Sequence, residues 1–218
     1  MRPLNVLYED NHIIVVVKPF NILSQGDSTG DQSIMDMVKE YIKVKYKKPG
    51  NVYLGLVHRL DRPVGGIMVF ARSSKAASRL TKAFSEHRIT KKYLAIVHGK
   101  MEGSGEFRDL IEKGADGNSF VSPNGKEAIL EYEVLKYNSQ KNCTLVSVSL
   151  KTGRHHQIRV QFASRGHYLL GDQRYGVVDN TQICLFAYYL SFQHPVTKEV
   201  LEFKYYPEKK EYWTSFTL

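Results

Sequence analysis

The stretch His58–Gly66 (HRLDRPVGG) places one carboxylate, Asp61, between two arginines, Arg59 and Arg62. The proline of this stretch fixes its own φ, and the two glycines accept positive φ, so the backbone can turn sharply. Residues 67–71 (IMVFA) follow at once and are apolar and β-prone, which predicts a buried strand. We therefore expect Asp61 on a rigid loop that leads into the core. The flanking cations favour its ionised form, which a nucleophile or a base needs.

Charge points to the kind of partner. The 218 residues include 31 Lys and Arg against 22 Asp and Glu, a net charge of +9, which indicates nucleic acid first and acidic lipid second. No apolar run approaches the length of a membrane span, and no signal peptide opens the chain, so we expect a cytoplasmic protein without a membrane association. Cys143 and Cys184 stand in no metal-ligand spacing and are expected to be reduced and packed.

Short strands dominate the predicted secondary structure. A capping box at Ser33 and Asp36 predicts one amphipathic helix, and Ser73 or Ser74 predicts a second that ends near His87. The glycine-punctuated residues 100–127 are expected to form short elements and exposed loops. Apolar or alternating runs predict strands at residues 4–8, 13–17, 52–57, 67–71, 89–99, 128–137, 143–150, 183–192 and 200–206.

A second stretch rich in charged and polar residues, 151–163 (KTGRHHQIRVQFA), is expected to begin as a turn and continue as a third helix. Arg154 and Arg159 near a helix start suit anions, because the free N–H groups and the helix dipole add to the cations. The pair His155–His156 invites a metal interpretation. Neighbouring residues project to different faces and no third ligand stands at a recognisable spacing, so we expect no metal site.

Several of these stretches together resemble the RluA family of RNA pseudouridine synthases, in the family's order and over nearly the whole chain. The loop departs from the family at one point. Relatives commonly continue HRLD with Thr-Ser-Gly, whereas this chain has Val64-Gly65-Gly66, so hydrogen bonds from those two hydroxyls are unavailable here. The matching pieces are the entry at 10–19, HRLDRPVGG at 58–66, KKYLAIVHG at 91–99, GRHHQIR at 153–159, GDQRYG at 171–176 and the turn His194-Pro195.

The resemblance implies an α+β fold, with a mixed, mainly antiparallel β-sheet and flanking helices and loops. It implies one catalytic domain over residues 1–218, without the S4 RNA-binding module that many relatives carry. The implied activity is isomerisation of a specific uridine in ribosomal or transfer RNA to pseudouridine, with no cofactor and no metal. The uridine must flip out of its stack, at a cost of a few kcal/mol. We expect RNA as the partner and a monomer.

The resemblance also implies roles for single residues. Asp61 matches the essential aspartate, which acts by covalent attack or by proton abstraction; the sequence leaves both routes open. Arg154 matches the cation that pairs with this carboxylate, and Tyr93 the pocket aromatic that stacks on the flipped base. Arg59 matches the residue that enters the RNA stack in place of the departed base. Phosphate contacts are expected from the remaining basic residues Arg62, Lys91, Lys92 and Arg159.

The rival hypothesis is a non-catalytic RNA-binding module or RNA chaperone on the same fold. Binding alone needs cations but no carboxylate that faces RNA phosphates, so the presence of Asp61, Tyr93 and Arg154 together argues against it. A metal-dependent nuclease lacks the clustered carboxylates it would need. A kinase catalytic loop lacks both the following Asn and the preceding glycine-rich loop.

Overall fold

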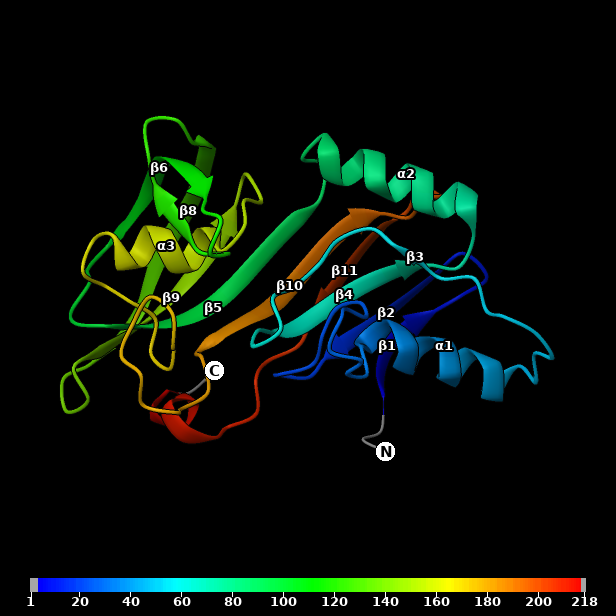
Figure 1. Ribbon diagram of the computed structural model, residues 1–218, viewed down its shortest axis with the longest axis horizontal. Helices are drawn as coiled ribbons and strands as arrows, with labels where there is room; N and C mark the ends of the chain where they lie inside the picture. Colours follow the sequence, from blue (N-terminus) through cyan, green and yellow to red (C-terminus); the bar gives the residue numbers. More distant parts are fainter. Residues whose placement is uncertain (1–3, 217–218) are drawn as a thin grey trace. The chain divides into compact units, whose positions relative to one another are not determined.

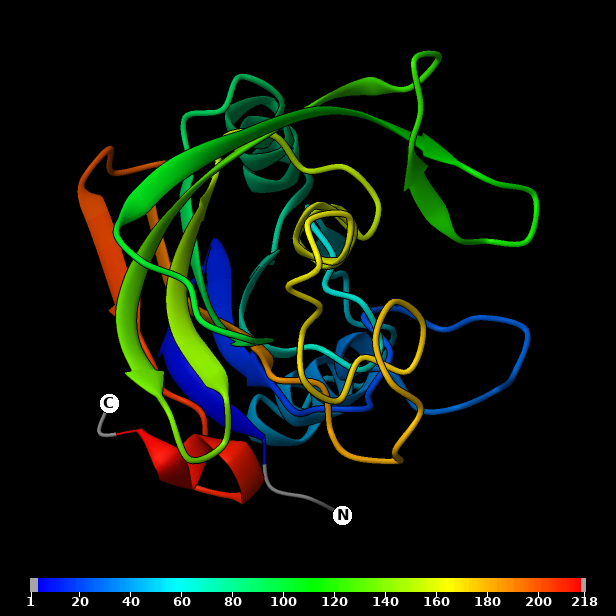
Figure 2. The same ribbon diagram turned by 90° about the vertical axis from the view of Figure 1, so that its left-hand side faces the viewer.

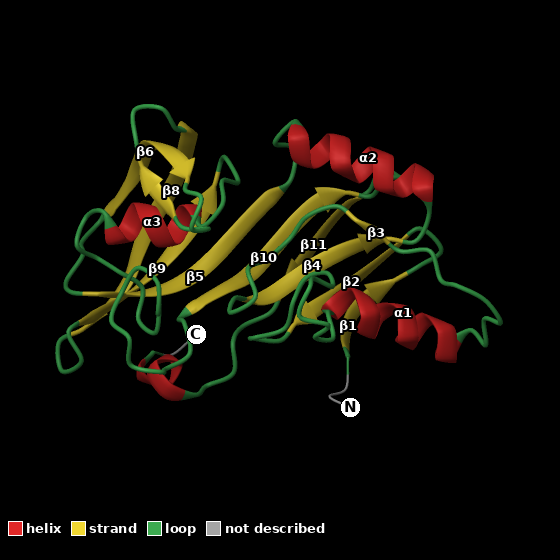
Figure 3. Cartoon of the chain, viewed as in Figure 1, coloured by secondary structure: helices red, strands yellow, loops and turns green. Residues whose placement is uncertain are grey.

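The structure, a computed structural model, describes residues 4–216 and divides into two compact units. Unit 1 comprises the chain up to Thr90 together with Tyr189–Tyr205, and unit 2 comprises Lys91–Tyr188 and the chain from Tyr206 onward. Strand β10 (Leu185–Gln193) carries the chain from unit 2 into unit 1. Figure 1 labels most of the elements, and Figure 3 colours helices, strands and loops separately.

Unit 1 is built on the antiparallel pairs β1–β2, β2–β4, β3–β4 and β10–β11. Every residue of β2 and β4 is buried, and both read as continuous rather than alternating apolar runs because neither face meets solvent. The register sets Lys18 opposite Gly66 at one end of this pair and Ile13 opposite Ala71 at the other. The strands are β1 (Asn5–Glu9), β2 (Ile13–Lys18), β3 (Gly55–Leu56), β4 (Gly65–Ala71) and β11 (Val200–Lys204).

Two helices complete unit 1, and both begin where their caps predict. Helix α1 (Ile34–Lys45) starts after the reciprocal capping box of Ser33 and Asp36, and α2 (Ser74–Ser85) starts after the N-cap Ser73. Helix α2 packs through its small apolar residues on one face of the sheet. The buried residues of this core are Ile13, Val15, Ile67, Val69, Ala71, Ala76, Leu80, Ala83, Ile89, Leu190 and Phe192.

Unit 2 is an antiparallel sheet in the order β5-β9-β8-β6-β7. Its strands curve around α3 (Gln157–Ala163), which Figure 2 shows end-on. The ring of Phe162 on α3 packs edge-on against Phe107 at 5.0 Å and Tyr132 at 6.0 Å between ring centres. The strands are β5 (Thr90–His98), β6 (Ser104–Lys113), β7 (Ser119–Val121), β8 (Lys126–Asn138) and β9 (Cys143–Leu150), and a 3-10 helix spans Glu211–Ser215.

The predicted fold class is confirmed, with three local corrections. The expectation of short elements and exposed loops over residues 100–127 is wrong for β6, which runs for ten residues and pairs with β8, a partner that local propensity does not reveal. The strand predicted at 52–57 shrinks to the two residues of β3. Gly65 and Gly66 lie inside β4, and the turn precedes them, closed by the Val64 N–H donating to the Asp61 carbonyl at 3.0 Å.

Within residues 4–216, no helix has the length and apolar character needed to cross a membrane.

Candidate active site

Asp61 lies in unit 1 on the loop between β3 and β4, and it is half-buried. The backbone on both sides of it is held by side chains from residues 18–24. The Ser24 hydroxyl donates to the Leu60 carbonyl at 2.6 Å and accepts the Leu60 N–H at 3.0 Å. The Lys18 ammonium donates to the Arg62 carbonyl at 3.1 Å. The peptide group before Asp61 and the carbonyl of the residue after it are therefore fixed, which is what a carboxylate with one catalytic geometry requires.

Lys18 is fully buried at the end of β2. Besides the Arg62 carbonyl, its ammonium donates to the carbonyls of Pro19 at 3.1 Å and Ile22 at 2.6 Å, so three acceptors match its three donors. Burial lowers the pKa of Lys18 to about 7, while the charge of Asp61 acts in the opposite direction. The Lys18 side chain is thus near enough to the predicted catalytic carboxylate for the two groups to interact electrostatically.

The other residues of this loop include one side chain that is fixed by contacts and two exposed arginines. His58 is an anchor, because its Nε2 accepts the Val69 N–H at 3.0 Å and its ring stacks on Phe84 at 4.7 Å. Arg59 is exposed. Arg62 is also exposed and pairs with the surface carboxylate of Asp31 at 2.7 Å. Both predicted RNA contacts on this loop therefore present their charges to solvent.

Arg154 lies in unit 2, on the turn that leads to α3. Its backbone N–H donates to the side-chain oxygen of buried Gln157 at 2.9 Å, and its Nε donates to the Glu127 carbonyl at 2.8 Å. Gln157 is held in turn by the Thr152 hydroxyl at 2.8 Å and by the Ile129 carbonyl at 3.1 Å. A guanidinium held through Nε keeps four N–H groups on its terminal nitrogens, enough for a bidentate pair with a carboxylate.

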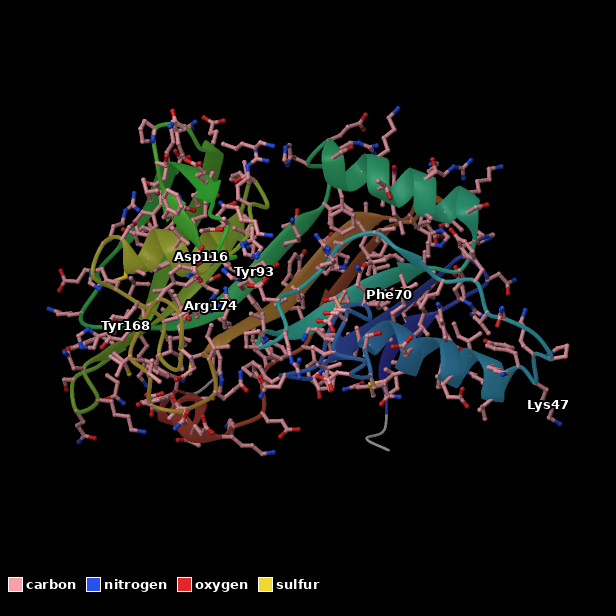
Figure 4. The ribbon with its side chains drawn as sticks, viewed as in Figure 1. Lys47, Phe70, Tyr93, Asp116, Tyr168 and Arg174 are labelled. Carbon is pink, nitrogen blue, oxygen red and sulfur yellow. The ribbon has the colours of Figure 1, made fainter. Side chains whose placement is uncertain are left out.

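Lys91 and Tyr93 lie at the start of β5 in the same unit. A Cβ placed on Gly153 would stand 3.6 Å from the Lys91 Nζ, so this lysine lies beside the turn that carries Arg154. Burial lowers the pKa of Lys91. Lys92 is half-buried, and Tyr93 is buried at 8% exposure opposite Val148 of β9. Figure 4 labels Tyr93 on β5.

Arg159 stands apart from the other predicted phosphate contacts. It is 4% exposed and forms a two-point ion pair with the fully buried Asp172, at 2.8 and 2.7 Å. Burial acts to raise the pKa of Asp172, but Arg159 together with the backbone N–H groups of Arg174 and Tyr175 outweighs it and holds the pKa below its ordinary value. This pair fastens α3 to residues 171–176. In this arrangement the Arg159 guanidinium is occupied inside the unit and does not reach a surface phosphate.

The adjacent histidines make separate structural contacts. Their rings stack at 3.7 Å between centres, with His155 Nδ1 2.9 Å from the Ser119 hydroxyl and His156 Nδ1 2.8 Å from the Tyr175 hydroxyl. Among residues 4–216 there is no group of three or more His, Cys, Asp or Glu side chains placed to hold a metal ion.

The sequence profile of a family described as RNA pseudouridylate synthase matches residues 12–164. The chain belongs to this family. It is 35% identical to an uncharacterized RNA pseudouridine synthase of Aquifex aeolicus, over 93% of this chain and 69% of that protein. It is 34% identical to the ribosomal large subunit pseudouridine synthase D of Vibrio cholerae, over 92% of this chain and 66% of the relative. The chain thus spans about two thirds of the length of these relatives.

Solved structures share the fold. Human RNA pseudouridylate synthase domain containing 4 superposes with a TM-score of 0.77 at 24% identity, covering 94% of this chain and 89% of the human one. Human RNA pseudouridylate synthase domain containing 1 gives a TM-score of 0.74, also at 24% identity, over 96% and 87% of the two chains.

Four supporting residues escaped the sequence reasoning: Lys18, Ser24, Thr152 and Gln157. Lys18 stood next to Pro19 at a strand end and gave no sign of burial, since lysines seldom lie fully inside a protein. The hydroxyls of Ser24 and Thr152 bond backbone groups 36 and 23 residues away, contacts that no local pattern encodes.

Proposed function

We propose that this protein isomerises a uridine in RNA to pseudouridine, and that the RNA is ribosomal. Family membership supports the reaction, and the name of the Vibrio cholerae relative favours ribosomal over transfer RNA. The observation that carries the proposal is the pair of clamps on the Asp61 loop. Ser24 and Lys18 fix the backbone on both sides of a single carboxylate, an arrangement that RNA binding alone would not require.

In the proposed reaction the bond between the ribose C1′ and N1 of uracil breaks, the base turns in the pocket, and C1′ bonds to C5. The proton lost from C5 is balanced by the one that N1 gains, so no cofactor is consumed. Asp61 starts the reaction as a carboxylate, whether it attacks covalently or abstracts a proton. Arg154 orients that carboxylate through its terminal nitrogens. We propose that residues 1–218 act as a single catalytic domain.

Recognition of the RNA divides among the remaining residues. Tyr93 supplies the ring on which the flipped base stacks, a contact worth about 1–3 kcal/mol. Arg59 enters the stack where the base has left. Arg62, Lys91 and Lys92 hold phosphates, whereas Arg159 serves the fold through Asp172. We propose a monomer that acts on RNA in the cytoplasm.

The deciding experiment compares Asp61→Asn with the matched surface variant Asp27→Asn on in vitro transcribed ribosomal RNA, with product measured by mass spectrometry. Asn keeps the shape of the side chain and loses only the charge. Asp61→Asn should form no pseudouridine, melt like wild type and bind RNA at least as tightly, because an anion that faces phosphates is gone. Asp27→Asn should behave as wild type in all three assays. Turnover by Asp61→Asn would refute the catalytic assignment.

The same assay tests the hypothesis of RNA binding without catalysis and the stacking role of Tyr93. RNA binding by the wild type without any pseudouridine would favour the chaperone hypothesis. Tyr93→Phe keeps the ring and should keep most turnover, whereas Tyr93→Leu should lose it while the protein still folds. If both variants react like wild type, Tyr93 is a core residue only.

A further inference from the structure

A basic surface lies at the C-terminal end of α1 in unit 1. Lys43, Lys45, Lys47 and Lys48 fall within six residues, and all four are exposed; we call this surface the α1 basic end. Figure 4 labels Lys47 at its tip. The negative end of the helix dipole explains cations in the last turn but not the two lysines beyond it.

The chain beyond the helix is folded back so that these lysines stay together. Lys47 has φ of +47°, a left-handed conformation uncommon for lysine. This bend lets the Lys48 N–H donate to the Lys43 carbonyl at 3.0 Å, and the Tyr46 N–H donates to the Ile42 carbonyl at 3.0 Å. The positions of the charges are thus set by backbone bonds rather than by a loose tail.

An exposed aromatic ring is fixed within the same surface. Tyr46 is 44% exposed, its hydroxyl donates to Glu9 at 2.7 Å, and the Arg72 guanidinium lies 4.8 Å from its ring centre. Lys45 also donates to Glu9. Burial acts to raise the pKa of Glu9, but the bonds from Lys45, Tyr46 and Tyr41 lower it overall, so the carboxylate stays ionised and paired. A rigid ring among cations is the composition that single-stranded RNA binds by stacking and charge.

The α1 basic end and Asp61 lie at opposite ends of β4. Asp61 precedes this strand, whereas Arg72, which contacts Tyr46, follows its last residue, Ala71. Seven residues of strand span about 20 Å. At ~3.4 Å for each stacked nucleotide, RNA that reaches from the target to this surface needs about six nucleotides beyond the target.

We propose that the α1 basic end is a second RNA-contact surface, which binds the backbone of the substrate strand about six nucleotides from the target uridine. This inference rests on the proposed function. RNA fits better than an acidic membrane, because the apolar face of α1 (Ile34, Met37, Val38 and Ile42) is buried in the core and no helical face remains to enter lipid. The surface would thus select long or extended substrates without taking part in the chemistry.

The test uses the triple variant Lys43→Ala/Lys47→Ala/Lys48→Ala, which leaves Lys45, Glu9 and Tyr46 intact. Its matched control removes three exposed lysines elsewhere in unit 1, as Lys75→Ala/Lys82→Ala/Lys198→Ala. Both are assayed on a minimal stem-loop with under four flanking nucleotides and on the same stem-loop with twelve on each side. Binding, single-turnover rate and melting temperature are measured at several salt concentrations.

The triple variant should bind the long RNA roughly ten-fold more weakly than wild type at 0.1 M salt, with a salt slope shallower by about two. It should match wild type on the short RNA in binding and rate, and the control should match wild type on both. Tyr46→Leu should weaken only long-RNA binding, and Tyr46→Phe should not.

Three results would overturn the inference. The triple variant and the control could bind the long RNA equally well, or the triple variant could lose the same affinity for the short RNA as for the long one. The triple variant could also lose binding to phosphatidylserine vesicles while its RNA binding is intact. Failure of the proposed function looks different, because wild type would then form no pseudouridine on either RNA.

Discussion

The hydroxyl of Ser24 bonds both backbone polar groups of Leu60, donating to its carbonyl and accepting its N–H. Leu60 is the residue before Asp61, and both Ser24 and Leu60 are buried. One small side chain therefore sets the orientation of the peptide that enters the proposed catalytic residue. This relationship makes Ser24 the most direct way to disturb Asp61 without changing any charge.

We expect Ser24→Ala to lower the free energy of unfolding by about 1–3 kcal/mol, because it strands a buried N–H and a buried carbonyl. The single-turnover rate should fall while RNA affinity holds, since the variant loosens the loop and removes no cation. Ser24→Thr keeps the hydroxyl and should restore the rate. A Ser24→Ala variant that reacts at the wild-type rate would show that the clamp serves stability alone.

Lys18→Met should lower the free energy of unfolding, because three carbonyls lose the ammonium that donates to them, and the size of the effect should depend on pH. Burial lowers the folded-state pKa of Lys18 from 10.5 to about 7. Below pH 7 the lysine is protonated in both states and its burial penalty is fully present. Between pH 7 and 10.5 the unfolded chain binds a proton that the folded chain releases, so wild-type stability rises with pH relative to Lys18→Met. Denaturant titrations of both proteins at pH 6.5, 8 and 9.5 measure the difference in their free energies of unfolding. A difference that stays constant over this pH range would contradict a lowered pKa for Lys18.

Gln157 should act through Arg154. Gln157→Leu preserves volume but removes the acceptor for the Arg154 N–H, so we expect kcat to fall at least ten-fold with little change in KM for RNA. Gln157→Glu keeps that acceptor and should retain more activity, although its second oxygen repels the Ile129 carbonyl. If KM rises instead and kcat is unchanged, the turn serves RNA binding rather than alignment of the carboxylate.

Arg159 and Arg62 should respond in opposite ways. Arg159→Met leaves the buried carboxylate of Asp172 without its partner and should cost about 3–5 kcal/mol of stability. Arg62→Ala breaks only an exposed pair and should leave stability within ~0.5 kcal/mol of wild type. It should instead remove about one phosphate contact, so the slope of the logarithm of RNA affinity against the logarithm of salt concentration becomes shallower by about one. A stable Arg159→Met with weakened RNA binding would restore the phosphate role predicted from sequence.

The sequence by itself determined the features that depend on near neighbours. The capping residues Ser33 and Ser73 placed the starts of α1 and α2, because a cap bonds N–H groups within three residues. The apolar run of β4 marked a buried strand, since only a strand covered on both faces can be apolar throughout. The motifs around Asp61 and Arg154 and the excess of basic residues pointed to the family and to RNA.

The tertiary structure alone decided which polar residues become scaffold. Arg159 and Arg62 look alike in sequence, yet one is enclosed against Asp172 and the other reaches solvent. Lys18 is a strand-end lysine whose three acceptors include a carbonyl 44 residues away. Strand β6 exists because β8 pairs with it. In each case the stabilising partner is distant along the chain, and the cost of burying a charge or a backbone group is met only where folding brings that partner into reach.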